Sequence, residues 1–205
     1  MMRVPALGVL LLLAIACNRD ARRMADSAGV VASSTAPNDT AIGSNAMALK
    51  VTSTAFQQGG AIPARYTCEG QDVSPALGWS GASKNAKTIA LIVDDPDAPD
   101  PAKPQRVYVH WVVYNIPVAS NSLPENASKS GMPQGAVQGK NDWGKAEYGG
   151  PCPPIGRHRY FFKFYALDTV LTGLSAPTKA DLERAMKGHV VDTGELMGTY
   201  EKAKK

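Results

Sequence analysis

The sequence has little net charge and only one apolar run of any length, and both features limit the protein classes that it can encode. Its formal net charge is +4 over 205 residues, and no basic tract is longer than the terminal Lys202–Lys205 segment. This distribution does not indicate a nucleic-acid-binding protein. The apolar run near the start is short, which excludes a membrane protein with several spans. With 44% hydrophobic and 20% charged residues, the composition is that of one ordinary globular domain.

Common nucleophile and nucleotide motifs are also missing. The chain has no Gly-x-Ser-x-Gly nucleophile elbow, no Gly-x-x-x-x-Gly-Lys-Ser/Thr phosphate loop and no internal repeat. We therefore expect a protein that is not an enzyme and that needs no metal ion or other cofactor.

The first 17 residues have the pattern of an export signal. A charged start is followed by an apolar stretch, Ala6–Ala16, and then by Cys17. The end of this segment resembles the bacterial lipoprotein box, in which the cysteine is lipidated and becomes the first mature residue. Because Asn18 rather than Asp follows, the known sorting rules favour a lipid anchor in the outer membrane, with the protein facing the periplasm. Ordinary cleavage, which would give a soluble periplasmic or secreted protein, is the alternative.

Residues 18–46 are small and polar, without a periodic apolar pattern, and they predict a flexible linker. The folded domain is then expected over residues 47–205. If Cys17 carries the lipid, the remaining cysteines, Cys68 and Cys152, form a pair in an oxidising compartment. We predict a disulfide between them, and two free buried thiols are the alternative.

The predicted domain is mainly β. Short runs rich in Val, Ile, Tyr and Phe alternate with clusters of Gly, Pro, Asn and Asp, which is typical of a β-sandwich with long loops. One helix is expected late in the chain, capped by Thr178 with Asp181 and stopped by Gly188. Residues Tyr200–Lys205 are expected to be a polar tail. The expected strands are Leu49–Phe56, Leu77–Trp79, Thr88–Val93, Val107–Ile116 and Arg159–Leu167.

A first group of chemically active residues follows the apolar run Leu91–Val93. Asp94, Asp95 and Asp97 lie in a loop stiffened by proline, and in an extended chain Asp95 points away from the other two. One carboxylate could therefore line a pocket while another braces the backbone. Carboxylates that only organise a turn are the alternative.

A second group lies at the end of the rigid, proline-rich loop 149–157. His158 and Tyr160 share one face of the strand that follows, so that an imidazole and a phenol lie side by side. His110 is the other histidine within a strongly apolar strand. Histidines in strands are often hydrogen-bonded core residues, and this is the structural alternative to a ligand site.

These motifs resemble the phosphatidylethanolamine-binding proteins, also called Raf-kinase-inhibitor-like proteins, in their bacterial YbhB/YbcL branch. The resemblance covers about residues 47–202 and depends on Asp95–Pro99, Val109–Trp111 and Gly156–Tyr160, with Tyr66–Gly70 and Tyr148–Pro154 typical of the bacterial branch. It implies a Greek-key β-sandwich with a small C-terminal helical part and an anion pocket at one end. The implied ligand-binding residues are Asp95, Pro96, His110, Pro154, His158 and Tyr160, with Asp97 and Pro99 bracing the loop.

The expected function is a non-catalytic, envelope-anchored binding or inhibitor-like protein. Its pocket would take a small phosphorylated or anionic ligand, such as phosphate or a phospholipid head group, and it could regulate a kinase-like or protease-like protein partner. Two alternatives stay open. One is a metal-dependent or acid–base hydrolase that uses Asp95, His110 and His158, and the other is a phospholipid carrier. The three tryptophans, Trp79, Trp111 and Trp143, are expected in the core or at the pocket rim.

Overall fold

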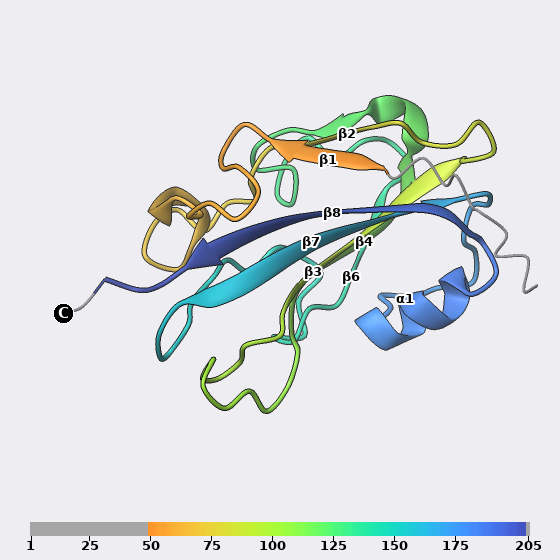
Figure 1. Ribbon diagram of the computed structural model, residues 1–205. Coiled ribbons are helices and arrows are strands. Elements are labelled where there is room, and N and C mark those ends of the chain that lie inside the picture. The colour runs from red at the N-terminus through yellow and green to blue at the C-terminus, as the bar shows by residue number, and fades with distance from the viewer. Residues whose placement is uncertain (1–48, 204–205) are drawn as a thin grey trace, which may run out of the picture. The chain divides into compact units, whose positions relative to one another are not determined.

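Two antiparallel sheets form the domain. The computed structural model describes residues 49–203, so the predicted export segment, Cys17 and the linker lie outside the described residues. Figure 1 shows β1 and β2 of the smaller sheet lying over one face of the larger sheet. The smaller sheet has the order β1-β2-β5, with bounds Lys50–Ser53, Leu77–Ser80 and Ser122–Leu123. The larger has the order β6-β4-β3-β7-β8, with bounds Val137–Gly139, Tyr108–Pro117, Thr88–Asp95, His158–Leu167 and Val190–Tyr200.

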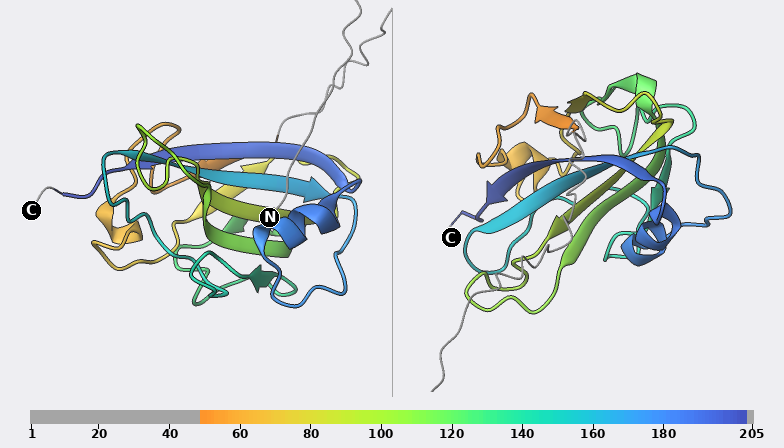
Figure 2. Two further views of the ribbon diagram at one scale, coloured as in Figure 1. Left: turned by 90° about the horizontal axis from the view of Figure 1, so that it is seen from below. Right: turned by 45° about the vertical axis from the view of Figure 1, so that its right-hand side comes forward.

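The helical part of the described chain is small. The 3-10 helices η1 and η2 span Ala64–Tyr66 and Val118–Ser120, and the helix α1 spans Lys179–Met186. The views in Figure 2 place α1 beside the larger sheet, away from β1. No helix within residues 49–203 is long and apolar enough to cross a membrane.

The core has two layers, one on each face of the larger sheet, and β3 is buried on both faces. Its alternate residues Ile89, Leu91 and Val93 pack in the large cluster between the two sheets, whereas Ala90 and Ile92 pack in a smaller cluster beneath α1. This two-sided burial explains why β3 is an almost continuous apolar run in the sequence. The predicted mainly β fold class is confirmed, and the structure contains all five predicted strand regions, with shifted ends.

The predicted helix is also confirmed. Thr178 accepts a hydrogen bond from the amide of Asp181, and the Asp181 carboxylate accepts one from the amide of Thr178, which completes a capping box. Leu182 and Met186 are buried against the sheet.

The prediction was wrong at the C-terminal end, where it missed β8, the longest strand of the described chain. Gly194 and Gly198 interrupt the apolar pattern of this segment and lower its apparent strand propensity. Both glycines are needed for close packing, since a Cβ atom on Gly194 would overlap the carbonyl of Leu49. Tyr200, predicted in a polar tail, is buried, and its hydroxyl donates to Glu69.

A β-bulge in β4 positions a residue for the site described below. Val93 pairs with Trp111 and Asp94 pairs with Val109, so His110 is the extra residue on β4. Trp111 lies between the sheets and Val109 lies on the α1 side, and the bulge turns His110 away from the α1 side. Bulges commonly redirect one side chain in this way next to functional sites.

Candidate functional site

One cavity gathers most of the predicted ligand-binding residues. It has a volume of about 340 Å³ and lies where β3 ends and where β4 and β7 begin. Strands of an antiparallel sheet bring these ends together, so the loops that follow β3 and precede β7 leave the same end of the sheet (Figure 1). The lining residues are Asp95, Ala98, Pro99, Tyr108, His110, Trp143, Cys152, Pro153, Pro154, His158 and Tyr160.

His158 lines this cavity but uses both ring nitrogens within the protein. Its Nδ1 atom lies 2.7 Å from Asp95 Oδ2, and its Nε2 atom lies 3.0 Å from the carbonyl oxygen of Ile155. The other Asp95 oxygen, Oδ1, accepts from the amide of Asp97 at 2.8 Å. The Asp95 carboxylate thus bridges the His158 ring and the backbone of its own loop. This buried pair holds the end of β3 against the start of β7, and both His158 nitrogens are already used in hydrogen bonds within the protein.

His110 is arranged differently from His158. Its Nδ1 atom lies 2.7 Å from the carbonyl oxygen of Gly149, and Nε2 has no hydrogen-bond partner among the described residues. The side chain is only 3% exposed, and burial lowers the pKa of His110, although the acidic groups nearby oppose this effect. A neutral ring with its proton on Nδ1 leaves a lone pair on Nε2.

Tyr160 brings a second polar group with unused hydrogen-bonding capacity. Its hydroxyl is buried and has no hydrogen-bond partner of good geometry within residues 49–203. Burial raises the pKa of Tyr160 far above its usual value, and the charge of Asp95, whose carboxylate lies near the hydroxyl without an aligned hydrogen bond, adds to this effect, so the phenol keeps its proton. The ring stands edge to face with His110, with the ring centroids 5.2 Å apart. Because buried hydroxyls nearly always have partners, this orphan group is the clearest sign of a ligand site.

The loop after β3 is braced by Asp97. Its two carboxylate oxygens accept three hydrogen bonds from Arg159, at 2.9 Å from the amide, 2.9 Å from Nε and 2.6 Å from Nη2. The hydrogen bonds from the Arg159 side chain lower the pKa of Asp97.

The prolines of this loop differ from the expectation. Pro96, predicted in the cavity wall, is not among the lining residues, whereas Pro99, predicted only to brace the loop, is one of them. The chain turns at Pro96 because Asp95 accepts from the amide of Asp97, and this turn brings Ala98 and Pro99 back towards the cavity. The Ala98–Pro99 peptide bond is cis.

Asp94 points to the opposite face of the sheet from Asp95, as strand alternation predicts. Its fully buried carboxylate lies 2.8 Å from Lys163 Nζ of β7 and 2.6 Å from Lys179 Nζ of α1. These two ion pairs attach α1 to the sheet, so Asp94 has a structural role away from the cavity.

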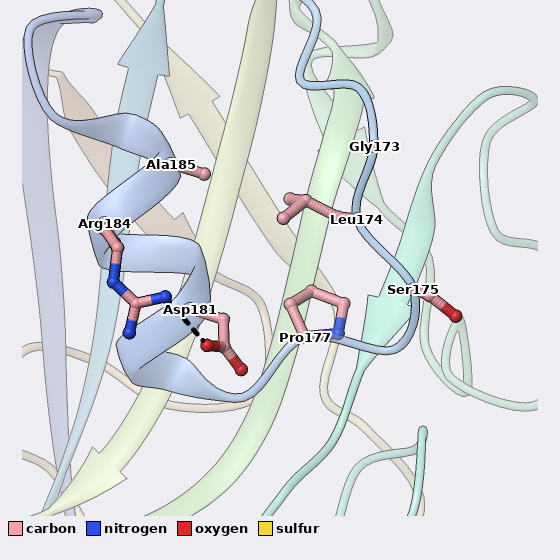
Figure 3. A pocket seen from close by; sticks show the side chains of 7 residues that line it. All are labelled: Gly173, Leu174, Ser175, Pro177, Asp181, Arg184 and Ala185. Carbon is pink, nitrogen blue, oxygen red and sulfur yellow. Dashed lines mark hydrogen bonds and ion pairs between the residues drawn. The ribbon is translucent and has the colours of Figure 1, made fainter.

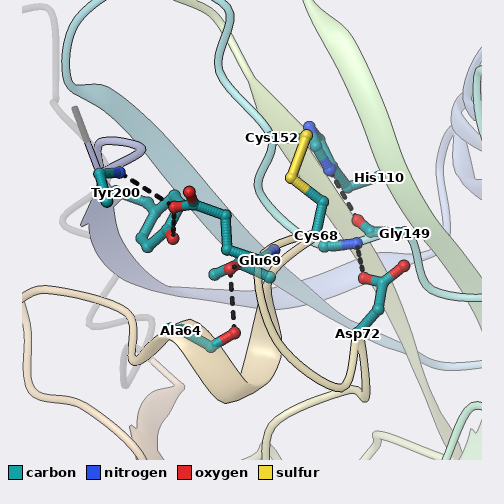
Figure 4. Close-up of a disulfide and its surroundings, with 11 residues drawn as sticks. Ala64, Cys68, Glu69, Asp72, His110, Gly149, Cys152 and Tyr200 are labelled. Atoms are coloured by element: carbon teal, nitrogen blue, oxygen red, sulfur yellow. Dashed lines mark hydrogen bonds between the residues drawn. A yellow bond between two sulfur atoms is a disulfide. The ribbon is translucent and has the colours of Figure 1, made fainter. Parts of the chain in front are cut away.

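The loop between β6 and β7 forms another wall and is fixed by the predicted disulfide. Cys68 and Cys152 are bonded, with Cα atoms 5.4 Å apart, which confirms the predicted pairing. Figure 4 shows the disulfide beside the hydrogen bond between His110 and Gly149. The amide of Gly150 also donates to Asp72 Oδ1 at 2.7 Å. The loop that supplies the carbonyl acceptor for His110 is therefore held by one covalent and several polar links.

Two aromatic residues complete the rim of the cavity. Tyr108 and Trp143 make an edge contact with ring centroids 4.8 Å apart, and Trp143 also contacts His110 at 5.2 Å. Trp143 is 45% exposed, unlike the buried core residues Trp79 and Trp111. The sequence prediction missed Tyr108 as a lining residue, although its place two residues before His110 in the same strand was a usable signal.

The comparisons with known proteins agree with this architecture. A model of the phosphatidylethanolamine-binding protein family matches residues 52–201. The chain belongs to this family. It is 51% identical over 147 residues to a UPF0098 protein of Methanothermobacter thermautotrophicus, a match that covers 71% of this chain and 94% of the relative.

Two solved structures of family members are similar to this one. A putative phosphatidylethanolamine-binding protein homologue from Chlamydia trachomatis, CT736, has a TM-score of 0.70 at 44% identity. Escherichia coli YbcL, described as a member of the mammalian PEBP family, has a TM-score of 0.68 at 34% identity. Each match covers 76% of this chain and 99% of the other.

A second hollow in this family member offers less chemistry. A cavity of about 350 Å³ lies between α1 and the segment before it (Figure 3), but its charged residues, Asp181 and Arg184, pair with each other at 3.2 Å. Within the described part of the chain, no group of three or more His, Cys, Asp or Glu side chains is arranged to hold a metal ion. The cavity around His110 and Tyr160 is thus the best candidate site.

Proposed function

We propose that this protein is a non-catalytic binding protein whose cavity receives a small anionic group, such as phosphate or the phosphate of a lipid head group. The observation that carries the proposal is the buried Tyr160 hydroxyl, a donor without a good partner, in a cavity that also contains the free Nε2 atom of His110. A protonated phenol is a good donor to an anionic oxygen. The name of the family, phosphatidylethanolamine-binding protein, supports a phosphate group as this ligand.

The engagement of Asp95 and His158 argues against acid–base roles for two of the three residues that the hydrolase alternative would use, and it leaves His110 as the third. Acid–base chemistry needs a carboxylate or imidazole that can exchange a proton with the substrate. Both Asp95 oxygens and both His158 nitrogens already have partners within the protein. The cavity volume of about 340 Å³ is also closer to the size of a head group than to that of a whole phospholipid, which argues against the carrier alternative.

Calorimetric titration of the full chain with phosphoethanolamine and with methyl phosphate tests this proposal. We expect saturable binding that Tyr160→Phe weakens by about 1.5–3 kcal/mol, the usual contribution of one hydrogen bond to a charged group. Tyr165→Phe is the matched control, because Tyr165 lies on the same strand but packs on the α1 side of the sheet. Equal binding by the wild type and by Tyr160→Phe, or no binding by the wild type, would contradict the proposal.

We also propose that a lipid on Cys17 anchors the protein to the cell envelope, in the outer membrane facing the periplasm. The support is the sequence pattern of residues 1–17, which lie outside the described structure. Several acyl chains would tether a soluble domain durably. Growth with labelled palmitate should label the wild type but not Cys17→Ser, and the variant should leave the membrane fraction. Unchanged fractionation of Cys17→Ser would refute the anchor.

A further inference from the structure

The proton on His110 is placed by the backbone. A carbonyl oxygen only accepts hydrogen bonds, so the contact of 2.7 Å between Nδ1 and Gly149 O requires a proton on Nδ1. The backbone returns the contact, because the amide of Gly149 donates to the carbonyl of His110 at 3.0 Å. The loop that carries Gly149 is further held by the Cys68–Cys152 disulfide. The ring therefore has little freedom to reverse, and Nε2 is the nitrogen that faces a ligand.

The groups around His110 do not supply a free cation. Asp95 of β3 is paired with His158 of β7, and Asp142 in the loop after β6 is paired with Arg106 at 2.6 Å. Asp94 faces the other side of the sheet, where it meets Lys163 and Lys179. The remaining titratable neighbours are the phenols of Tyr108 and Tyr160. Burial lowers the pKa of His110 and outweighs the opposing effects of the hydrogen bond with Gly149 and of the three carboxylates.

The cavity thus places a buried donor close to an acceptor. The donor is the Tyr160 hydroxyl, and the acceptor is His110 Nε2. Both residues line the same cavity, and their rings are in edge-to-face contact with centroids 5.2 Å apart. A fully deprotonated dianion would accept from Tyr160 but would meet the Nε2 lone pair with another lone pair, which is repulsive. A ligand that satisfies both groups must carry its own proton next to an anionic oxygen.

We propose that the cavity selects a phosphate monoester in its protonated, monoanionic form, whose P–OH donates to His110 Nε2 while a P–O⁻ oxygen accepts from Tyr160. This inference rests on the proposed function and specifies the ligand class of the same site. Sulfate carries no proton at neutral pH and a phosphodiester has no P–OH group, so both lack the donor that Nε2 requires. The chemistry therefore favours monoesters over sulfate and over the diester linkage of an intact phospholipid.

Calorimetric titration of the full chain with methyl phosphate, dimethyl phosphate and sulfate tests this selection. At pH 6 we expect methyl phosphate to bind at least tenfold more tightly than the other two anions. Above the second pKa of the monoester, about 6, its affinity should fall about tenfold per pH unit. At pH 7.5, titrations in two buffers of different ionisation enthalpy should report about one proton taken up per ligand bound.

The outcomes separate this inference from the proposed function. If methyl phosphate and sulfate bind equally well and without proton uptake, the cavity is a general anion site and the selection is refuted. If none of the three anions binds at millimolar concentration, the proposed function fails together with the selection.

A variant and a spectroscopic measurement test the role of His110 itself. His110→Phe keeps a ring of similar size but lacks the acceptor, and it should bring methyl phosphate down to the affinity of dimethyl phosphate. A preference that survives in a folded variant would refute the assignment. Nitrogen-15 NMR of the wild type, which needs no variant, should show Nε2 unprotonated both before and after methyl phosphate is added. Protonation of Nε2 on binding would place the proton on the protein and overturn the proposal.

Discussion

Removal of the Cys68–Cys152 disulfide should be among the most destabilising changes that leave the core intact. The two cysteines are separated by 84 positions in the sequence, so the bond closes a long loop. In the chain-entropy description, a loop of this length restricts the unfolded chain enough to stabilise the fold by about 4–5 kcal/mol at 25 °C. Domains of this size commonly have a total stability of only about 5–15 kcal/mol, so this loss would be large.

Urea denaturation of the Cys68→Ser/Cys152→Ser double variant measures this contribution. Cys17→Ser is the matched control, because it removes the third cysteine without breaking the pair, and it should leave the midpoint unchanged. The wild type measured with a reducing agent should match the double variant. A loss of less than about 1 kcal/mol in the double variant would refute the loop-closure argument.

The same double variant should still fold under mild conditions and bind ligand less tightly. Three hydrogen bonds near the disulfide remain between the two loops, from the Cys68 position to Pro151 O, from Gly150 to Asp72 and from Tyr148 to Tyr66 O. They hold the loop less rigidly than a covalent bond does. Binding that is as tight as in the wild type would show that these contacts alone hold the cavity wall.

Three further changes have smaller expected effects. Thr178→Ala removes the capping box of α1 and should lower the free energy of unfolding by about 1 kcal/mol, measured by urea denaturation. Gly150→Ala places a Cβ atom against backbone atoms and should lower the free energy of unfolding by about 2 kcal/mol. In Gly149→Ala the nearest atoms belong to the half-exposed indole ring of Trp143, so the loss should be less than about 1 kcal/mol, and tryptophan fluorescence and ligand affinity should change instead. Equal losses of stability in the two variants would contradict this contrast. Asp97→Asn should cost about 1–2 kcal/mol at pH 7, because half-exposed Arg159 is partly screened by solvent. Since Arg159 lowers the pKa of Asp97 in the folded protein, this stabilisation is present above about pH 4 and is lost as the pH falls further, so the variant and wild-type stabilities should converge in acid.

The fold was predictable where one local pattern determined the structure. The continuous apolar run of β3 and the capping box before α1 each give a clear signal. The sequence signal for β8 is weaker because the strand contains Gly194 and Gly198. These positions are glycine because residues distant in the sequence, such as Leu49, pack closely against them. Such contacts exist only after folding, and a single sequence does not reveal them.

The candidate site was predictable as a set of residues but not in its detailed arrangement. The resemblance to the family brought together His110, His158 and Tyr160, and all three line one cavity. Strand alternation alone would have placed His110 on the same face as Val112, which packs beneath α1. The bulge that redirects His110 depends on its pairing with β3, which no local pattern shows.

The hydrogen-bonding roles of the two histidines are determined by backbone carbonyls that side-chain motifs do not encode. Ile155 O occupies Nε2 of His158, whereas Gly149 O occupies Nδ1 of His110, so chemically identical rings present different atoms to the cavity. His158 thereby becomes a support for Asp95, whereas His110 keeps Nε2 free of partners within the described residues. Both carbonyls belong to one loop, and its attachment through Cys152 holds it in place. In the proposed complex, the loop therefore controls which protonation state of a ligand the cavity accepts, although none of its residues that line the cavity is charged.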